Sequence, residues 1–340
     1  MGTKQASPPR SRTRPAAEPL TEQTQSSSGW LFGLGCAVIV LAGTGLFGWS
    51  DAAVVGAWRT LLVSIVVQGV PFLLLGTVVS AAIGAFVPPS LFARILPKNP
   101  ALAVPVAGVA GVVLPGCECA SVPVAGSLMR RGVTPAAALA FLLSAPAVNP
   151  VVLVSTAIAF PGKPEMVAAR LAASLITAIT MGWLWIRFGK EEWLRLPKRP
   201  ESHGTGGSRW EEFRRGMQHD FLHAGGFLVV GAMAAATFNV LVPPGVLAMF
   251  TDSPWLSVPL LALLAVLLSV CSEADAFVAA SLTGFSPTAR LAFMVVGPMV
   301  DMKLIALQSG AFGRAFPARF ASTTFVVAIL VSVLIGAVLL

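Results

Sequence analysis

Long apolar runs follow one another along most of this chain, separated by short polar breaks or breaks that contain Pro and Gly. They fall near residues 30–50, 57–87, 101–129, 135–160, 166–188, 221–243, 255–283, 288–311 and 319–340. A run of about 20 apolar residues is long enough for a helix to cross a bilayer. The period-2 alternation of a membrane β-barrel is absent, and Ala, Leu and Gly dominate. The pattern therefore predicts an all-α polytopic membrane protein.

Two polar stretches interrupt this pattern and indicate its orientation. Residues 1–28 are rich in Pro, Ser, Thr, Gln and Arg, which predicts a disordered tail, and residues 29–55 form an extra first transmembrane helix. Residues 189–220 form a basic loop. Basic segments beside membrane spans usually face the cytoplasm, so we expect the tail and the loop on that side of the cytoplasmic membrane. A cleaved signal peptide is not expected, because the first apolar run has the length of a span.

The chain also repeats itself at an offset of 152 residues. Nine of thirty positions from Cys119 to Val148 are identical to their counterparts without a gap. The matched pairs include Cys119 with Cys271, Gly132 with Gly284, Pro135 with Pro287, Pro146 with Pro298, and Asn149 with Asp301 in a related role. Upstream, with small gaps, Gly76 matches Gly231. The sequence therefore predicts two transmembrane repeats, residues 56–188 and 221–340.

The distribution of basic residues predicts how the two repeats are oriented in the membrane. A cytoplasmic tail and a cytoplasmic loop require an even number of crossings between them. Residues 101–115 would span only about 22 Å as a helix, less than a hydrocarbon core of about 30 Å. We therefore expect residues 101–129 to form a re-entrant hairpin and residues 255–283 to form a second one from the opposite face. This gives inverted repeats with seven full spans. A nine-span topology remains the alternative.

Composition and charge exclude several classes of function. The chain is 56% hydrophobic and only 11% charged, against about 25% charged residues in soluble domains. The net charge of +8 is carried mainly by the tail and one loop, which indicates membrane topology and not nucleic-acid binding. The sequence has no Walker loop, no His-rich tract and no order of residues typical of a hydrolase. We expect a non-enzymatic protein with no cofactor, in contact with the lipid bilayer.

In the first repeat, the residues that point to chemistry are Cys117, Glu118 and Cys119, which follow a Pro-Gly break. Thiolates are soft ligands suited to Cu(I), Zn(II) or trivalent arsenic. A Cys-x-Cys pair alone lacks the spacing of a closed zinc site, so two small buried thiols at a tight turn remain the alternative. Cys36 lies on an ordinary apolar segment and is expected only to pack.

In the second repeat the matching stretch contains Cys271, Glu273 and Asp275. Carboxylates within a membrane segment usually face a cavity and serve ion or proton movement. An interfacial cluster near a hairpin tip is the alternative. Asp301 is two residues before a lysine, with which it would form a purely structural pair in the alternative interpretation. Its match to Asn149, which lies between two prolines, favours a functional role for both positions.

At these motifs the chain resembles a bacterial family of predicted permeases that includes organoarsenical efflux permeases and proteins assigned to copper or zinc efflux. The resemblance rests on Pro-Gly-Cys-Glu-Cys (115–119), Arg-Arg-Gly (130–132), Phe141 to Pro150, and Cys-Ser-Glu-Ala-Asp-Ala-Phe (271–277). It covers roughly residues 60–315. The cysteine motifs are more similar to an uncharacterised branch, whose members are often encoded beside a second, smaller membrane protein. The resemblance implies transport and leaves the substrate open.

The leading hypothesis is a secondary transporter that exports a soft metal ion or metalloid. Cys117, Cys119 and Cys271 are candidate ligands. The remaining candidate residues balance charge, carry coupling protons or contact the substrate at the helix break: Glu118, Asn149, Glu273, Asp275 and Asp301. The alternative is a membrane scaffold or accessory subunit with structural cysteines. An enzyme that uses Cys117 as nucleophile is disfavoured because no His lies within plausible sequence reach.

Overall fold

The computed structural model describes residues 53–88, 90–92, 96–97, 99–113, 117–196, 208–241 and 254–340, and within these ranges it contains helices and turns but no strand. The tail, most of the first predicted helix and Cys36 lie outside the described residues. In chain order the helices are α2 (Ala53–Phe86), α4 (Pro100–Ala110), the 3-10 turn η1 (Gly111–Val113), α5 (Glu118–Arg130), α6 (Pro135–Val148), α7 (Pro150–Ala159), α8 (Pro164–Phe188), the 3-10 turn η2 (Glu191–Trp193), α9 (Arg209–Leu241), α11 (Pro254–Leu268), α12 (Asp275–Ser281), α13 (Pro287–Val296), α14 (Met302–Phe312) and α15 (Ala315–Leu339).

Five helical segments of the described chain are long and apolar enough to cross a membrane, which confirms the polytopic all-α class. They are Val55–Phe86, Pro135–Ala159, Pro164–Phe188, Arg209–Thr237 and Ala315–Leu339. Each contains a part of one predicted span. Helix α9 begins inside the predicted basic loop, because Glu211 and Glu212 lie in its first turn and Glu211 pairs with Arg215 one turn later.

Several other helices are too short to span a bilayer. Helices α4 and α5 have 11 and 13 residues, and α11 and α12 have 15 and 7. Since a helix rises about 1.5 Å per residue, these lengths fit the predicted hairpins better than two further full spans. Residues 288–311, which we expected as one span, form two helices, α13 and α14. The break between them contains Gly297 and Pro298, which favour interruption of a helix.

The two halves of the chain have the same order of elements around a polar helix break. Asn149 is the N-cap of α7, and its side chain accepts a hydrogen bond from the amide of Val152 at 2.9 Å. Asp301 is the N-cap of α14, and its side chain accepts from the amide of Leu304 at 2.5 Å. These two residues match at the 152-residue offset. The inverted relation of the halves stays a prediction.

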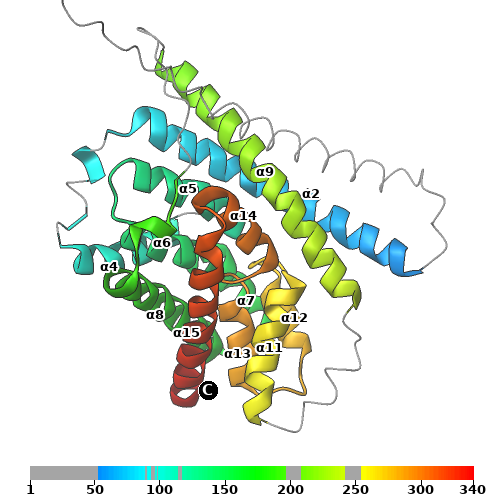
Figure 1. The fold of residues 1–340 in the computed structure, drawn as a ribbon. Helices are drawn as coiled ribbons and strands as arrows, with labels where there is room; N and C mark the ends of the chain where they lie inside the picture. Colours follow the sequence, from blue (N-terminus) through cyan, green and yellow to red (C-terminus); the bar gives the residue numbers. More distant parts are fainter. Residues whose placement is uncertain are drawn as a thin grey trace, which may run out of the picture.

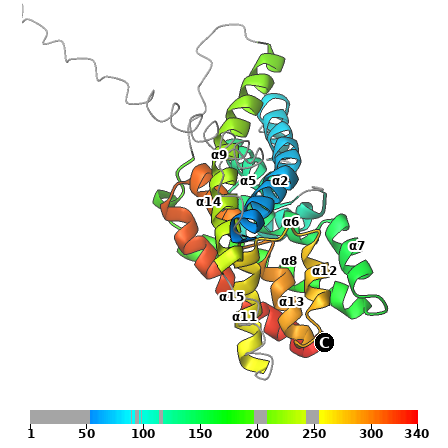
Figure 2. The ribbon, with the colours of Figure 1, turned by 90° about the vertical axis from the view of Figure 1, so that its right-hand side faces the viewer.

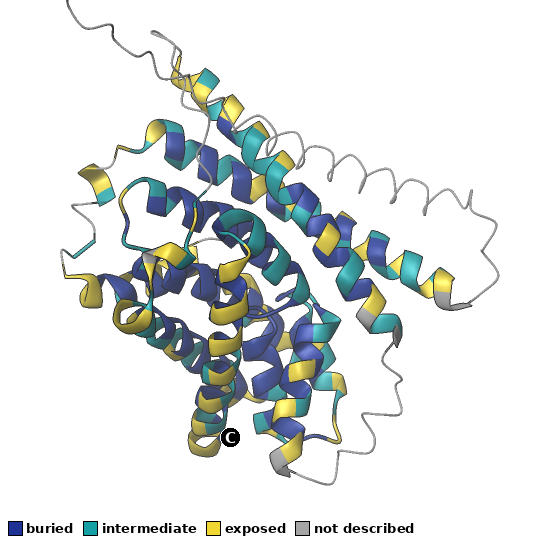
Figure 3. Cartoon of the chain, viewed as in Figure 1, coloured by how far each residue is buried: buried dark blue, intermediate teal, exposed yellow. Residues whose placement is uncertain are grey.

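The long helices α2 and α9 lie side by side and cross one face of the molecule (Figures 1 and 2). Helix α5 packs against α2, and α14 packs against α9. The other helices lie beyond this layer, with α8 against α15 and α6 against both α4 and α8. Burial is deepest in α5, α6 and α13 (Figure 3). The starts of α5 and α14 are therefore enclosed between the crossing helices and the rest of the bundle.

Two glycines allow this close packing. A Cβ atom at Gly76 of α2 would lie 2.4 Å from the Cα of Ala120 in α5, and one at Gly231 of α9 would lie 2.7 Å from the Cα of Lys303 in α14. Neither position has room for a larger side chain without backbone movement. The two glycines are the pair that the sequence repeat aligned, and each brings a crossing helix against the start of a short buried helix.

Candidate functional site

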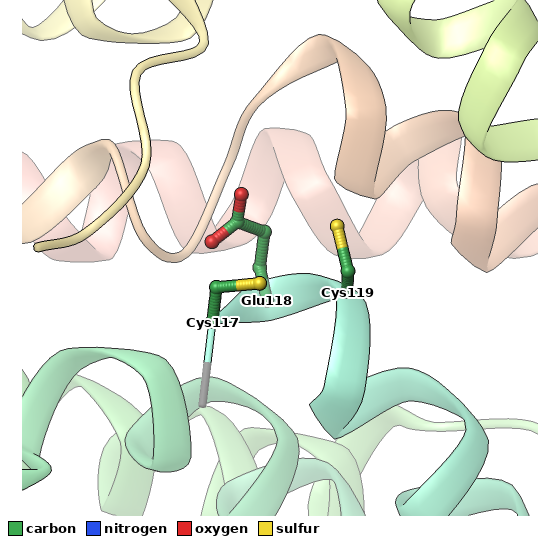
Figure 4. Close-up of side chains that lie close together, drawn as sticks. All are labelled: Cys117, Glu118 and Cys119. Carbon is green, nitrogen blue, oxygen red and sulfur yellow. The ribbon is translucent and has the colours of Figure 1, made fainter. Parts of the chain in front are cut away.

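The start of α5 carries a compact set of soft and acidic side chains. Cys117 is the N-cap of the helix, and Glu118 and Cys119 are its first two residues. All three are fully buried, and one ligand atom of each lies within 4.8 Å of the others. In Figure 4 the side chains of Glu118 and Cys119 point to the same side, toward the orange segment that contains α13 and α14. The Pro-Gly break before Cys117 lies outside the described residues.

A buried lysine from the other half of the chain meets this set. The ammonium nitrogen Nζ of Lys303 lies 2.8 Å from Oε1 of Glu118 and 3.7 Å from Oδ2 of Asp301. It also lies 3.9 Å from Sγ of Cys271. Lys303 has 2% of its surface exposed. The ammonium thus connects the first cysteine motif to the second, and three of its neighbours are residues that the sequence nominated as ligands or carriers of charge.

The local backbone explains why these groups converge. Asp301 caps α14, which fixes Lys303 in the first turn of that helix. Ser269, at the end of α11, has φ of 48°, the left-handed region that a non-glycine residue rarely adopts. In this conformation its hydroxyl accepts a hydrogen bond from the amide of Met302 at 3.1 Å. The segment that carries Cys271 is thereby attached to the start of α14.

A second buried ion pair lies on the same segment. The guanidinium of Arg170 in α8 donates to Oδ2 of Asp275 at 2.7 Å, to the hydroxyl of Thr156 at 2.8 Å and to the carbonyl of Ser272 at 3.3 Å. Arg170 and Asp275 are both buried. Glu273 is half-buried and lies in the chain between Cys271, which contacts Lys303, and Asp275, which pairs with Arg170. The stretch from Ser269 to Asp275 therefore connects both charged clusters.

Asn149 has a local structural role in this conformation. In addition to capping α7, its side-chain amide donates to the carbonyl of Ala145 at 3.3 Å. This satisfies backbone groups that the Asn-Pro break would leave exposed. The structure thus places Asn149 at the helix break, as the sequence predicted, and leaves its role toward a substrate as a prediction.

The sequence analysis did not identify Arg170 as a site residue, and it identified only one of the partners of Lys303. An arginine inside an apolar helix, two turns from its start, is a signal available in the sequence, because such a residue is expensive in a membrane and usually has a buried partner. Lys303 was considered only as a partner of its near neighbour Asp301. Its pairing with Glu118, 185 residues away, depends on the tertiary fold.

The site combines soft thiol groups with more hydrogen-bond acceptors than hydrogen-bond donors. In the described part of the chain, the buried oxygens Glu118 Oε2, Asp301 Oδ2, Glu273 Oε2 and Asp275 Oδ1 accept no hydrogen bond. Buried acceptors normally have a partner, and leaving one unsatisfied costs about 1–3 kcal/mol. Glu118 and Asp301 together carry two formal negative charges, whereas Lys303 carries one formal positive charge. The arrangement is thus suited to a further cation, with thiol and carboxylate groups as ligands.

Comparisons with known proteins identify a family of predicted permeases. A family model described as "Predicted permease" matches residues 55–337. The chain is 35% identical over 279 residues to the UPF0718 protein YcgR of Bacillus subtilis, covering 81% of this chain and 94% of that protein. It is 30% identical over 283 residues to a Streptococcus mutans protein named "Putative two-component membrane permease complex subunit", with the same coverage. No solved structure matches the chain.

Proposed function

The chain belongs to this family of predicted permeases, and from that premise we propose that it is a secondary-transporter-like permease that exports a soft metal ion or metalloid across the cytoplasmic membrane. In this proposal the substrate is bound by Cys117, Cys119 and Cys271, which come from the two halves of the chain. Membership in a permease family favours transport over an enzymatic use of Cys117. The tail and the basic loop are placed in the cytoplasm by the positive-inside rule.

One observation carries the proposal: the buried ammonium of Lys303 contacts Glu118, Asp301 and Cys271 together. A charged lysine is expensive in a membrane interior and needs such partners. A borderline cation such as Zn(II) accepts both thiolate and carboxylate ligands, and the thiol of Cys271 also suits softer ions. The ammonium therefore occupies the position that a transported cation would take between them.

This position suggests how binding and release work. Two cations in contact with the same carboxylates repel each other, so a substrate ion that binds Glu118 displaces the ammonium of Lys303. When the substrate leaves, the ammonium returns and compensates the buried carboxylates. Lys303 then acts as a tethered counter-cation that keeps the empty site stable and limits how tightly the substrate is held. A thiol that becomes a ligand releases its proton.

In this proposal, the carboxylates on the second hairpin couple substrate export to proton movement. Asp275 is held by Arg170, whereas Glu273, in the same segment, is only half-buried and makes no ion pair among the described residues. We assign proton movement to Glu273 and the support of the segment to Asp275. Intramembrane carboxylates beside a substrate site commonly carry coupling protons.

Uptake into everted membrane vesicles tests the function. Vesicles with the wild-type chain and vesicles without it are given Zn(II), Cu(I) and arsenite in turn, and accumulated metal is measured by mass spectrometry. We expect uptake of one or more of these, driven by an imposed proton gradient, and its loss in Cys117→Ser, Cys119→Ser and Cys271→Ser at normal protein abundance. Transport that survives all three thiol substitutions would exclude a soft substrate.

A second candidate function follows from the Streptococcus mutans relative, whose name describes a complex subunit. In that case this chain is a scaffold or accessory subunit whose buried thiols pack, and a second, smaller membrane protein completes the permease. Reconstitution of the purified chain into liposomes separates the two. Transport by the chain alone supports the first function, and transport only with a co-purified partner supports the second.

A further inference from the structure

A pocket lies apart from the thiol cluster, between α5, α9 and α14. Its cavity volume is about 40 Å³. Its lining includes Gly126 and Arg130 of α5, His219 and His223 of α9, and Leu307 and Ala311 of α14. These are the same three helices that enclose Glu118 and Lys303, although none of the lining residues belongs to that cluster. The function proposed above does not use the pocket.

Two helices lead from the pocket to the buried cluster. On α5, positions 119, 122, 126 and 130 follow at spacings of three or four residues, and the last three line the pocket. On α14, Leu307 and Ala311 follow Lys303 at the same spacing. Residues so spaced lie on one face of a helix. Arg130 and Cys119 are thus about 16 Å apart along α5, with the pocket at one end and the thiols at the other.

An apolar layer separates the pocket from the cluster in this conformation. Leu228 and Leu307 are buried, with exposures of 0% and 1%. A Cβ atom at Gly69 would lie 3.3 Å from the side chain of Leu228 and 3.8 Å from Sγ of Cys119, so Leu228 and Cys119 adjoin the same point of α2. A hydrated ion cannot pass such a layer without its opening, because apolar side chains cannot replace the water shell of the ion.

The polar groups of the pocket are suited to cations of the same class as the thiol cluster. The rings of His219 and His223 are stacked one helical turn apart, with centroids 6.0 Å apart. Nε2 of His223 lies 3.0 Å from the carbonyl oxygen of Gly310. A carbonyl only accepts, so Nε2 carries a proton, and Nδ1 is the ring nitrogen that would bind a metal ion. Nδ1 of His219 makes no hydrogen bond within the described residues and lies 3.5 Å from Oδ1 of Asp220.

We propose that this pocket is the loading vestibule of the permease: a borderline or soft cation enters it from the end where α9 begins, contacts His219 and His223, and passes the Leu228–Leu307 layer to the thiol cluster. This inference rests on the proposed transport function and assigns the route to it. The hydroxyl of Ser80 donates to Asp220 at 2.8 Å, and Asp220 lies 3.7 Å from Arg130. The negative charge of Asp220 is therefore balanced by Arg130 within the pocket lining.

Reversible blocking of the pocket tests the route. Ala311→Cys is made in the full chain and treated, in everted vesicles, with a charged methanethiosulfonate reagent. We expect modification to stop uptake and dithiothreitol to restore it, because the adduct fills the pocket and leaves the thiol cluster intact. Arg209→Cys, at the exposed start of α9, is the matched control, and the wild-type chain reports any reaction of native thiols. Modified Ala311→Cys that transports at the wild-type rate would overturn the proposal.

Transport kinetics test the two imidazoles. The chain has three histidines, so His203→Ala is a natural control for the His219→Ala/His223→Ala double variant. We expect the double variant to raise KM about tenfold with little change in kcat, as loss of an early contact predicts, and the control to leave both unchanged. An unchanged KM in the double variant rules out the loading contact. A wild-type chain that transports no metal instead contradicts the function itself, while the rate of reagent attachment at position 311 still measures whether the pocket is open to water.

Discussion

Lys303 is the residue on which the interpretation of the site depends. Its ammonium lies 2.8 Å from Glu118 in a buried environment. Removing one partner of a buried pair leaves an uncompensated charge and typically costs about 3–5 kcal/mol. In a site built for a cation, that cost is recovered when the substrate binds. In a purely structural pair, no ligand recovers it.

Lys303→Met should therefore make the protein less stable without metal and more responsive to it. We expect a lower Tm for the purified variant and a larger upward shift of Tm with Zn(II) than in the wild-type chain, because the ion replaces the missing ammonium. Transport should be lost, since the ion is no longer displaced. Thermal unfolding of both proteins with and without Zn(II) measures this. Equal shifts of Tm with Zn(II) in the two proteins would mean that Lys303 has only a structural role.

Glu273 and Asp275 should differ in what their loss does. Asp275→Asn leaves Arg170 buried without its charge partner, so we expect lower abundance and a stability loss of about 3–5 kcal/mol. A paired Arg170→Gln/Asp275→Asn variant should recover part of that loss. Glu273→Gln should be normally abundant and fail to transport. Normal proton-driven transport by Glu273→Gln at normal abundance would remove Glu273 from the coupling step.

Helix α2 packs closely against the start of α5 at Gly76. Gly76→Val should shift α5, because the added Cβ alone would lie 2.4 Å from the backbone of Ala120. Overpacking of this kind typically costs about 1–3 kcal/mol. Gly56→Val on the same helix is the control, since a Cβ at Gly56 meets nothing within 4 Å. We expect reduced abundance and transport for the first variant and wild-type values for the second, by immunoblot and vesicle uptake. Equal behaviour of the two would mean that α2 is free to adjust.

Most helices and their breaks could be predicted from the sequence because their causes are local. The prolines that begin α6, α7 and α13, and the polar caps Asn149 and Asp301, fix helix ends within a few residues. The ion pairs could not be predicted, because Glu118–Lys303 and Arg170–Asp275 join residues more than a hundred positions apart. Periodicity reports which face of a helix is apolar and does not identify the partner that meets it.

Most of the basic residues at helix ends in the described part of the chain lie at one end of the bundle, although Lys163 and Arg290 lie at the starts of α8 and α13. Arg131 lies 4.0 Å from Glu212 near the start of α9, and the guanidinium of Arg319 lies 4.5 Å from the ring centroid of Trp193 after α8. The amide of Arg195 donates to the carbonyl of Phe312, at the end of α14, at 2.9 Å. At the opposite end, Gly336 of α15 adjoins Thr288 at the start of α13. This distribution distinguishes the two ends of the bundle, and Arg130 and Asp220 in the vestibule lining lie toward the basic end.

The positive-inside rule then makes a prediction for the orientation of the molecule. A cysteine at position 205, in the basic loop, should be labelled by a membrane-impermeant maleimide only after permeabilisation of cells, whereas one at position 252 should be labelled without it. Both are introduced into a chain whose four cysteines are replaced by Ser. The first result places the vestibule at the cytoplasmic face of the membrane, where a substrate that is exported must bind first. The second result, together with the first, requires that α9 crosses the membrane. Labelling of position 205 on intact cells would reverse the direction of the proposed route, and matching accessibility of both positions would exclude α9 as a membrane span.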